Sequence, residues 1–251
     1  MEKRISILGA SGSVGKQALD VAESSGYKLD IISADKNIPA IEAAIRRHSP
    51  RLAFMSDESA ARDLKIRVSD TDTKVFGGKD LDQFLRENLC SDTVVNAISG
   101  YHGLAPTLAV IDRGARLALA NKESLVIAGD VVMRAAKEKN AEIIPVDSEH
   151  SAIFQSLHAG KREEIAKILL TASGGPFYGK SPEELQNVTK EQVLAHPTWK
   201  MGPKITIDSA SLMNKGFEVI EAVYLFDVKP EQVEVVVHRE SIVHSAIEYV
   251  D

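Results

Sequence analysis

The sequence predicts an α/β protein with an N-terminal doubly wound parallel sheet, followed by an α+β domain. Up to about residue 145, short β-branched runs alternate with amphipathic stretches, as in parallel strands joined by crossover helices. A glycine-rich segment also joins the first such run to the first amphipathic stretch, where these sheets bind their ligands. We expect the first domain at residues 1–147 and the second at residues 148–251.

The pattern of apolar residues predicts each strand and helix. Apolar or β-branched runs predict strands at residues 5–8, 29–33, 51–55, 93–96, 116–118 and 142–146. One-sided apolar patterns predict helices at residues 17–22, 38–48, 80–88, 103–113 and 129–139. We expect Gly26 to end the first helix and the Ser49-Pro50 pair to end the second. Alternation predicts two strands in the second domain, at residues 233–237 and 242–250.

Composition narrows the class of protein. The 251 residues are 44% hydrophobic and 26% charged, which excludes intrinsic disorder and a coiled-coil rod. A net charge of −6 argues against nonspecific binding to nucleic acid or to an anionic membrane surface. The single cysteine, Cys90, has no partner for an internal disulfide, so we expect a cytoplasmic protein. No apolar run approaches the ~18 residues of a membrane span.

Gly9, Gly12 and Gly15 lie between the first strand and the first helix. This spacing is typical of the Rossmann-like dinucleotide site, where glycines let the backbone approach a pyrophosphate at a helix N-terminus. The alternative is a tight turn without a ligand. At the end of the second strand, Lys36 suits a 2′-phosphate and Asp35 suits a 2′-hydroxyl, so NADP and NAD both remain open.

Polar groups elsewhere suggest an anion and metal site. In an extended segment, Asp147 and Glu149 would project to the same side and could share a hard cation. The alternative is that Ser148 caps a helix at residues 151–158, with Glu149 in its first turn. Lys122, in a loop after a strand, could meet an anion or belong to a simple helix start.

The second half of the chain carries three further candidates. Asn214, Lys215 and Glu218 would share one face of a helix. The turn at residues 173–176, Ser-Gly-Gly-Pro, suits wrapping a small anion. Trp199 lies among prolines and a glycine, which suits a mobile flap, although a buried anchor tryptophan is the alternative.

Six blocks in order then carry a family resemblance: GASGSVG, ALANKESLV, PVDSEHSAIFQ, TASGGPF, HPTWKMG and IDSASLMNKGFEVIEA. The chain resembles the 1-deoxy-D-xylulose 5-phosphate reductoisomerase family of the non-mevalonate isoprenoid route. The resemblance implies that an NADPH-dependent oxidoreductase rearranges and reduces this phosphorylated ketose to 2-C-methyl-D-erythritol 4-phosphate. It also implies a homodimer, and a divalent cation that is Mg²⁺, Mn²⁺ or Co²⁺.

The resemblance also implies roles for individual residues. Metal ligands and catalytic carboxylates would be Asp147, Glu149 and Glu218, with Lys122 as a further catalytic residue. Substrate contacts would come from Lys122, Ser148, Glu149, Ser173, His196, Ser209, Asn214, Lys215 and Glu218, and the flap from His196, Trp199 and Met201. Cofactor contacts would come from Ser11, Gly12, Ser13, Val14, Lys36, Asn37, Asn121, Glu123 and Gly202.

Two departures from the family pattern accompany the resemblance. Asp35 stands where the family usually has glycine, so we expect weaker discrimination between NADPH and NADH. Family members continue beyond the block that ends at Asp251, so we expect an incomplete catalytic domain whose turnover is weak or absent. Two alternatives remain: a nucleotide-binding module without turnover, and a metal-independent NAD(P)-dependent aldehyde or semialdehyde dehydrogenase.

Overall fold

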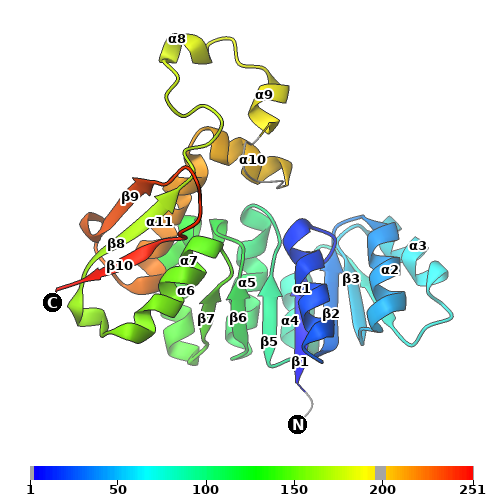
Figure 1. The fold of residues 1–251 in the computed structure, drawn as a ribbon. Helices are drawn as coiled ribbons and strands as arrows, with labels where there is room; N and C mark the ends of the chain where they lie inside the picture. The colour runs from blue at the N-terminus through cyan, green and yellow to red at the C-terminus, as the bar shows by residue number, and fades with distance from the viewer. Residues whose placement is uncertain (1–2, 196–201, 251) are drawn as a thin grey trace. The chain divides into compact units, whose positions relative to one another are not determined.

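The computed structural model describes residues 3–195 and 202–250. The chain divides into two compact units, Met1–Ile144 and Pro145–Asp251. The division lies between residues 144 and 145, whereas the sequence pattern places it between residues 147 and 148. Figure 1 labels the elements of both units.

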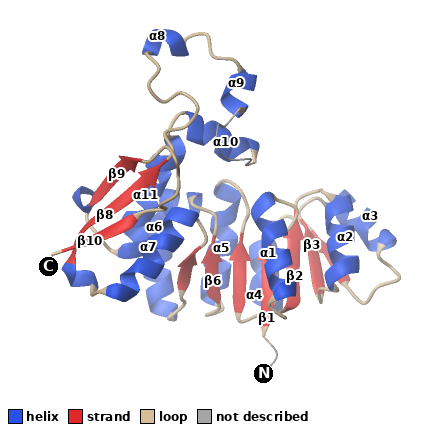
Figure 2. Ribbon diagram, viewed as in Figure 1, coloured by secondary structure: helices blue, strands red, loops and turns tan. Residues whose placement is uncertain are grey.

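A parallel sheet forms the core of the first unit (Figure 2). Its strands are β1 (Arg4–Leu8), β2 (Lys28–Ala34), β3 (Leu52–Met55), β4 (Lys74–Gly77), β5 (Thr93–Asn96), β6 (Arg116–Leu119) and β7 (Ile143–Pro145). Their order is β4-β3-β2-β1-β5-β6-β7, and β1 pairs in parallel with both β2 and β5. The strand order reverses between β1 and β5, and this switch point is where doubly wound sheets bind ligands. The predicted fold class is confirmed.

Helices follow most of these strands. They are α1 (Ser13–Ser24), α2 (Ile38–His48), α3 (Glu58–Arg67), α4 (Leu81–Asn88), α5 (Leu104–Asp112) and α6 (Glu123–Lys139), with a 3₁₀ turn, η1 (Tyr101–Gly103), before α5. Apolar residues of α1, α2 and α3 pack into one core cluster with β1, β2 and β3, whereas α5 contacts α4 and α6. This packing holds α1 against β1 and β2, next to the switch point.

Two elements of the first unit were not predicted. The sequence of α3 is largely polar and buries only Ala60, Ala61 and Leu64, so its apolar face is narrow. The strand β4 is mostly exposed, and its apolar run is only Val75 and Phe76, too short to indicate a strand. The helix α6 begins at Glu123 rather than near residue 129, and it has a kink at Ala128, where the dihedral angles are non-helical.

The second unit contains a small mixed sheet of β8 (Ile165–Ala172), β9 (Val233–Val237) and β10 (Ala246–Tyr249), in the order β10-β8-β9. The central strand β8 pairs in parallel with β9 and antiparallel with β10. Its helices are α7 (Ser148–Ser156), α8 (Pro182–Leu185), α9 (Lys190–Leu194), α10 (Pro203–Ala210) and α11 (Met213–Phe226), and its 3₁₀ turns are η2 (Leu157–Ala159), η3 (Arg162–Glu164) and η4 (Pro230–Gln232). Both α7 and α11 pack on this sheet and on one another.

The predicted helix at residues 151–158 and strand at 242–250 differ from α7 and β10. The helix begins three residues earlier, at Ser148, and the strand begins only at Ala246 because Ser245 has a left-handed φ of 74°. Within residues 3–195 and 202–250, no helix has the length and apolar character that crossing a bilayer requires.

Candidate metal centre and nucleotide site

Three carboxylates meet in the second unit. Asp147, Glu149 and Glu218 each offer one oxygen atom, and these atoms all lie within 4.8 Å of one another. Asp147 precedes the first residue of α7, Glu149 lies in its first turn, and Glu218 lies on α11. Carboxylate oxygens are the ligands that Mg²⁺ and Mn²⁺ prefer. The donor set therefore fits a hard divalent cation.

The local geometry corrects part of the sequence argument. Asp147 and Glu149 were expected to share one side of an extended segment, but the chain is already helical from Ser148. Ser148 is not the cap of this helix either: Asp147 occupies the cap position, and the Ser148 hydroxyl donates to Glu149 Oε2 at 2.6 Å. The helix start, rather than strand alternation, brings the two carboxylates together.

The His150 ring makes hydrogen-bonding contacts with two of these acidic residues. Its Nδ1 lies 3.2 Å from Asp147 Oδ1, and its Nε2 lies 2.9 Å from the backbone carbonyl oxygen of Glu218. Burial lowers the pKa of this fully buried imidazole, but the hydrogen bond to Asp147 and the nearby carboxylates outweigh burial and raise the pKa to about 9. In the protonated state both ring nitrogens donate, so His150 orients both residues.

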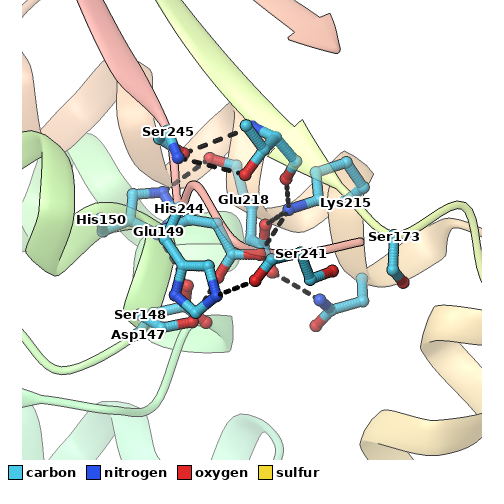
Figure 3. Close-up of polar contacts among 12 residues, drawn as sticks. Asp147, Ser148, Glu149, His150, Ser173, Lys215, Glu218, Ser241, His244 and Ser245 are labelled. Carbon is cyan, nitrogen blue, oxygen red and sulfur yellow. Dashed lines mark hydrogen bonds and ion pairs between the residues drawn. The ribbon is translucent and has the colours of Figure 1, made fainter. Parts of the chain in front are cut away.

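Lys215 places a positive charge beside the carboxylates (Figure 3). Its Nζ lies 3.0 Å from Glu149 Oε1 and also contacts Glu218 Oε2 and the carbonyl oxygen of Thr171. One turn of α11 relates the neighbouring Asn214 to Glu218, and the Asn214 amide donates to Glu218 Oε1. Helical spacing was expected to place these three side chains on one face, and their contacts on α11 confirm it.

Ser173 and Ser209 belong to adjoining backbone segments. Ser173 begins the turn after β8, where the Gly175 N–H donates to the Ser173 hydroxyl oxygen at 3.4 Å. Gly174 and Gly175 both have left-handed φ values, 82° and 69°. A Cβ on Gly175 would lie 2.6 Å from the carbonyl oxygen of Ser209, so only glycine allows this turn to pack against the end of α10.

The glycine loop, residues 9–15, lies in the first unit at the carboxyl end of β1. Gly9 has a φ of 79°, and a Cβ there would lie 2.6 Å from the carbonyl oxygen of Ala97, after β5. A Cβ on Gly15 would lie 2.2 Å from the Gly9 carbonyl oxygen. Gly12 occupies the cap position of α1 without a side-chain cap. The first backbone N–H groups of α1 thus face the switch point, as a bound pyrophosphate requires.

Six cofactor candidates lie along this loop, in the first residues of α1 and after β2. Ser11, Gly12, Ser13 and Val14 line the loop itself and are exposed or partly exposed. Asp35, Lys36 and Asn37 are exposed after β2, and Asn37 Oδ1 accepts from the Ala40 N–H at 3.2 Å as the cap of α2. Capping gives Asn37 a structural role beside the predicted one.

Asn121, Lys122 and Glu123 lie between β6 and α6. The buried Asn121 amide donates to the carbonyl oxygens of Ile98 and Gly100 at 2.7 and 2.8 Å, which joins the loops after β5 and β6. Lys122 is buried and Glu123 is half-buried. Lys122 belongs to the first unit and the carboxylates to the second, so its predicted contact with substrate stays a prediction.

The predicted flap lies outside the described residues. This holds for His196, Trp199 and Met201, whereas Gly202 is described as the cap of α10. Their proposed contacts with substrate and cofactor stay predictions.

Sequence reasoning missed several residues near the three carboxylates, and Figure 3 labels Ser241, His244 and Ser245 among them. Glu221 is buried one helical turn after Glu218, and its Oε2 lies 3.7 Å from His150 Nδ1. Ser245 and Thr171 exchange two hydrogen bonds, and His244 Nε2 lies 3.0 Å from the Ser241 carbonyl oxygen. The i+3 spacing from Glu218 could have identified Glu221. The others depend on backbone pairing that no short motif encodes.

Comparisons with known proteins point to one family. Residues 5–129 match a family model described as 1-deoxy-D-xylulose 5-phosphate reductoisomerase, and residues 143–226 match the model of its C-terminal domain. A curated 1-deoxy-D-xylulose 5-phosphate reductoisomerase from Acetivibrio thermocellus is 51% identical over 251 residues, covering 100% of this chain and 66% of its own. The protein of that name from Desulfitobacterium hafniense strain Y51 is 49% identical, with 99% and 66% covered. The chain thus spans just under two thirds of these relatives.

Solved structures agree in fold. A crystal structure of DOX-P reductoisomerase in complex with NADPH, fosmidomycin and magnesium has a TM-score of 0.91 and 40% identity, covering 99% of this chain and 64% of its own. A Zymomonas mobilis 1-deoxy-D-xylulose 5-phosphate reductoisomerase in complex with NADPH has a TM-score of 0.90 and 38% identity, with 100% and 65% covered.

Proposed function

The chain belongs to the 1-deoxy-D-xylulose 5-phosphate reductoisomerase family, and on that premise we propose that it takes part in the NADPH-dependent conversion of 1-deoxy-D-xylulose 5-phosphate to 2-C-methyl-D-erythritol 4-phosphate. The observation that carries the proposal is the convergence of Asp147, Glu149 and Glu218 within 4.8 Å, beside a lysine and an asparagine. A metal-independent dehydrogenase has no need of such a cluster.

The three carboxylates would hold Mg²⁺, Mn²⁺ or Co²⁺. A cation there supplies Lewis acidity, which polarises a substrate carbonyl and stabilises negative oxygen. The chain's own residues prepare this site: His150 orients Asp147 and the backbone of Glu218. Lys215 offsets part of the repulsion between Glu149 and Glu218, which otherwise raises the free energy of the folded state.

The substrate phosphate would be held by hydroxyl, amide and ammonium groups. We assign this role to Ser173, Ser209, Asn214 and Lys215, with Ser148, Lys122 and His196 as further substrate contacts. Support comes from the packing of the Ser173 turn against the backbone of Ser209, and from Asn214 and Lys215 on one face of α11. Hydroxyls and one cation suit a phosphate in a protein of net charge −6.

NADPH would bind to the first unit and supply the hydride. Its pyrophosphate would meet Ser11, Gly12, Ser13 and Val14 at the start of α1, and the 2′-phosphate would meet Lys36 and Asn37. Support comes from the close glycine packing at the switch point between β1 and β5. Asn121, Glu123 and Gly202 complete the proposed cofactor contacts.

An assay of NADPH oxidation at 340 nm tests the proposal directly. We expect oxidation that requires both 1-deoxy-D-xylulose 5-phosphate and Mn²⁺ and that stops when a chelator is added. Oxidation of NADPH by small aldehydes that a chelator leaves unchanged would select a metal-independent dehydrogenase instead. Cofactor binding in calorimetry, without substrate-dependent oxidation, would select a nucleotide-binding module.

The oligomeric state and the cellular location complete the proposal. The family resemblance supports a homodimer, which light scattering of the purified protein would test against a monomer. The single cysteine, Cys90, supports a cytoplasmic location, which cell fractionation would test.

A further inference from the structure

Arg239 lies beside the Ser173 turn, by which we mean Ser173, Gly174, Gly175 and Pro176. The turn follows β8, and Arg239 follows β9, which pairs with β8 in parallel as far as Ala172 opposite Val237. His238 extends this pairing because its N–H donates to the Ala172 carbonyl oxygen at 2.8 Å. The strand register therefore delivers Arg239 to the turn.

The guanidinium of Arg239 binds both ends of the two-glycine corner. Its Nη1 donates to the carbonyl oxygens of Ser173 and Gly175, both at 3.0 Å. The guanidinium carbon lies 5.0 Å from the ring centroid of Tyr178, two residues after the turn. A Cβ on Gly174 would lie 2.9 Å from the Tyr178 ring and 3.2 Å from Arg239 Nη1, so the side chains close tightly around the turn.

These contacts restrain a backbone that is otherwise free to change. Gly174 and Gly175 both have left-handed φ values, and glycine reaches other conformations without steric penalty. The Ser173 hydroxyl is oriented by the N–H of Gly175, so a change in the corner would turn that hydroxyl away. A guanidinium whose Nη1 donates to two carbonyl oxygens while its flat face lies against a ring is suited to this restraint. A lysine ammonium could donate to the carbonyl oxygens but lacks the flat face.

We propose that Arg239 is a positioning residue for oxyanion binding: it holds the Ser173 turn in the conformation that presents the Ser173 hydroxyl to the substrate phosphate. This inference rests on the proposed function, which assigns Ser173 to the phosphate. Arg239 acts through backbone carbonyls and not through the metal centre: within residues 3–195 and 202–250, its contacts are with the carbonyl oxygens of Ser173 and Gly175 and with the Tyr178 ring.

Calorimetric titration with inorganic phosphate in the presence of Mn²⁺ tests this role. We expect Arg239→Leu to weaken phosphate binding about tenfold, the scale of losing a charged hydrogen-bond donor. Arg239→Lys should recover part of the affinity. Arg162→Leu is the matched control, because it removes the same charge from an exposed residue of η3. The Mn²⁺ affinity, measured by paramagnetic resonance, should stay unchanged in all three variants.

A second pair of variants tests the stacking contact. Tyr178→Phe keeps the ring beneath Arg239 and should bind phosphate as the wild type does, whereas Tyr178→Leu should weaken phosphate binding. In steady-state kinetics, Arg239→Leu should raise KM for the phosphorylated substrate more than it lowers kcat.

Several outcomes would overturn the inference. Equal phosphate affinity in Arg239→Leu and the wild type would do so, as would absence of phosphate binding in the wild type. A parallel loss of Mn²⁺ affinity would show general structural damage in place of positioning. Failure of the proposed function is distinguishable, because it would appear as a wild-type protein without a Mn²⁺ site, while the phosphate comparison still decides the role of Arg239.

Discussion

Individual side chains of the proposed metal centre depend on one another. Asp147, Glu149 and Glu218 repel unless positive charge lies among them, and Lys215 and protonated His150 supply such charge in the protein itself. Removing either cation leaves carboxylates without their partner, which is more costly than losing a surface ion pair.

His150 permits a direct test of this dependence. His150→Phe keeps an aromatic ring beside Phe226, whose ring lies 6.1 Å away, but removes both hydrogen bonds. We expect Mn²⁺ affinity to fall about 10- to 100-fold, as for other residues that orient metal ligands. The control is His158→Phe, at an exposed residue of η2, the turn that follows α7. It should leave the Mn²⁺ affinity unchanged. Wild-type affinity in His150→Phe would show that the imidazole does not orient the ligands.

Asp35 permits a second test at this scale, in the first unit. Its exposed carboxylate precedes Lys36, so it would lie near the 2′-phosphate of NADPH and repel it. We expect Asp35→Gly to raise the ratio of kcat/KM for NADPH over NADH by several-fold, about 1 kcal/mol of discrimination. Unchanged selectivity would reject the explanation. The exposed Asp72 is a suitable position for a control substitution, which should leave the cofactor selectivity unchanged. Asp57 is not suitable, because it caps α3.

The sequence predicts which residues are candidates for the site better than it predicts which of them lie close together in the fold. Spacing related Asn214, Lys215 and Glu218, because one helix turn fixes their neighbourhood. It could not bring Glu218 to Asp147 and Glu149, since that approach depends on the packing of α11 against α7. Arg239 could not be predicted from the sequence, because its hydrogen-bond partners are backbone carbonyl oxygens, which every residue has.

At the scale of elements, the turn between β1 and α1 connects the sheet to the proposed nucleotide site. The glycines there are required by contact, not only by conformation, because Gly15 packs on the Gly9 carbonyl oxygen. The sequence pattern located this turn and most of the strands, since buried parallel strands have continuous apolar runs. It missed α3 and β4, whose apolar faces are narrow or short.

We expect Gly15→Ala to destabilise the first unit by about 2–3 kcal/mol, because a methyl group has no room 2.2 Å from a backbone oxygen. Gly26→Ala is the matched control at the far end of α1. Its φ is also left-handed, at 70°, but its Cβ would meet nothing within 4 Å, so only backbone strain of about 1 kcal/mol remains. Chemical denaturation measures both values. Equal losses would show that the close contact contributes nothing.

At the scale of the whole molecule, the two proposed ligand sites lie in different compact units. The glycine loop lies in Met1–Ile144, and the carboxylates and the Ser173 turn lie in Pro145–Asp251. In the sequence, the alternation of short strands and crossover helices ends near residue 145, and the expected boundary after residue 147 lies close to this division.

Hydrogen exchange tests this division. We expect Mn²⁺ alone to slow amide exchange in α7 and α11, and NADPH alone to slow it in the loops after β1 and β5, because ligands stabilise the segments that they bind. Protection of α1 by Mn²⁺ alone, without any effect on α7, would contradict the assignment.

The central claim is that Asp147, Glu149 and Glu218 form a divalent-metal site, and a paramagnetic resonance titration with Mn²⁺ measures it most directly. We predict one Mn²⁺ site per chain, with affinity at least tenfold weaker in Glu218→Gln and unchanged in Glu231→Gln, an exposed carboxylate of η4. Equal Mn²⁺ binding by the wild type and Glu218→Gln would contradict the account.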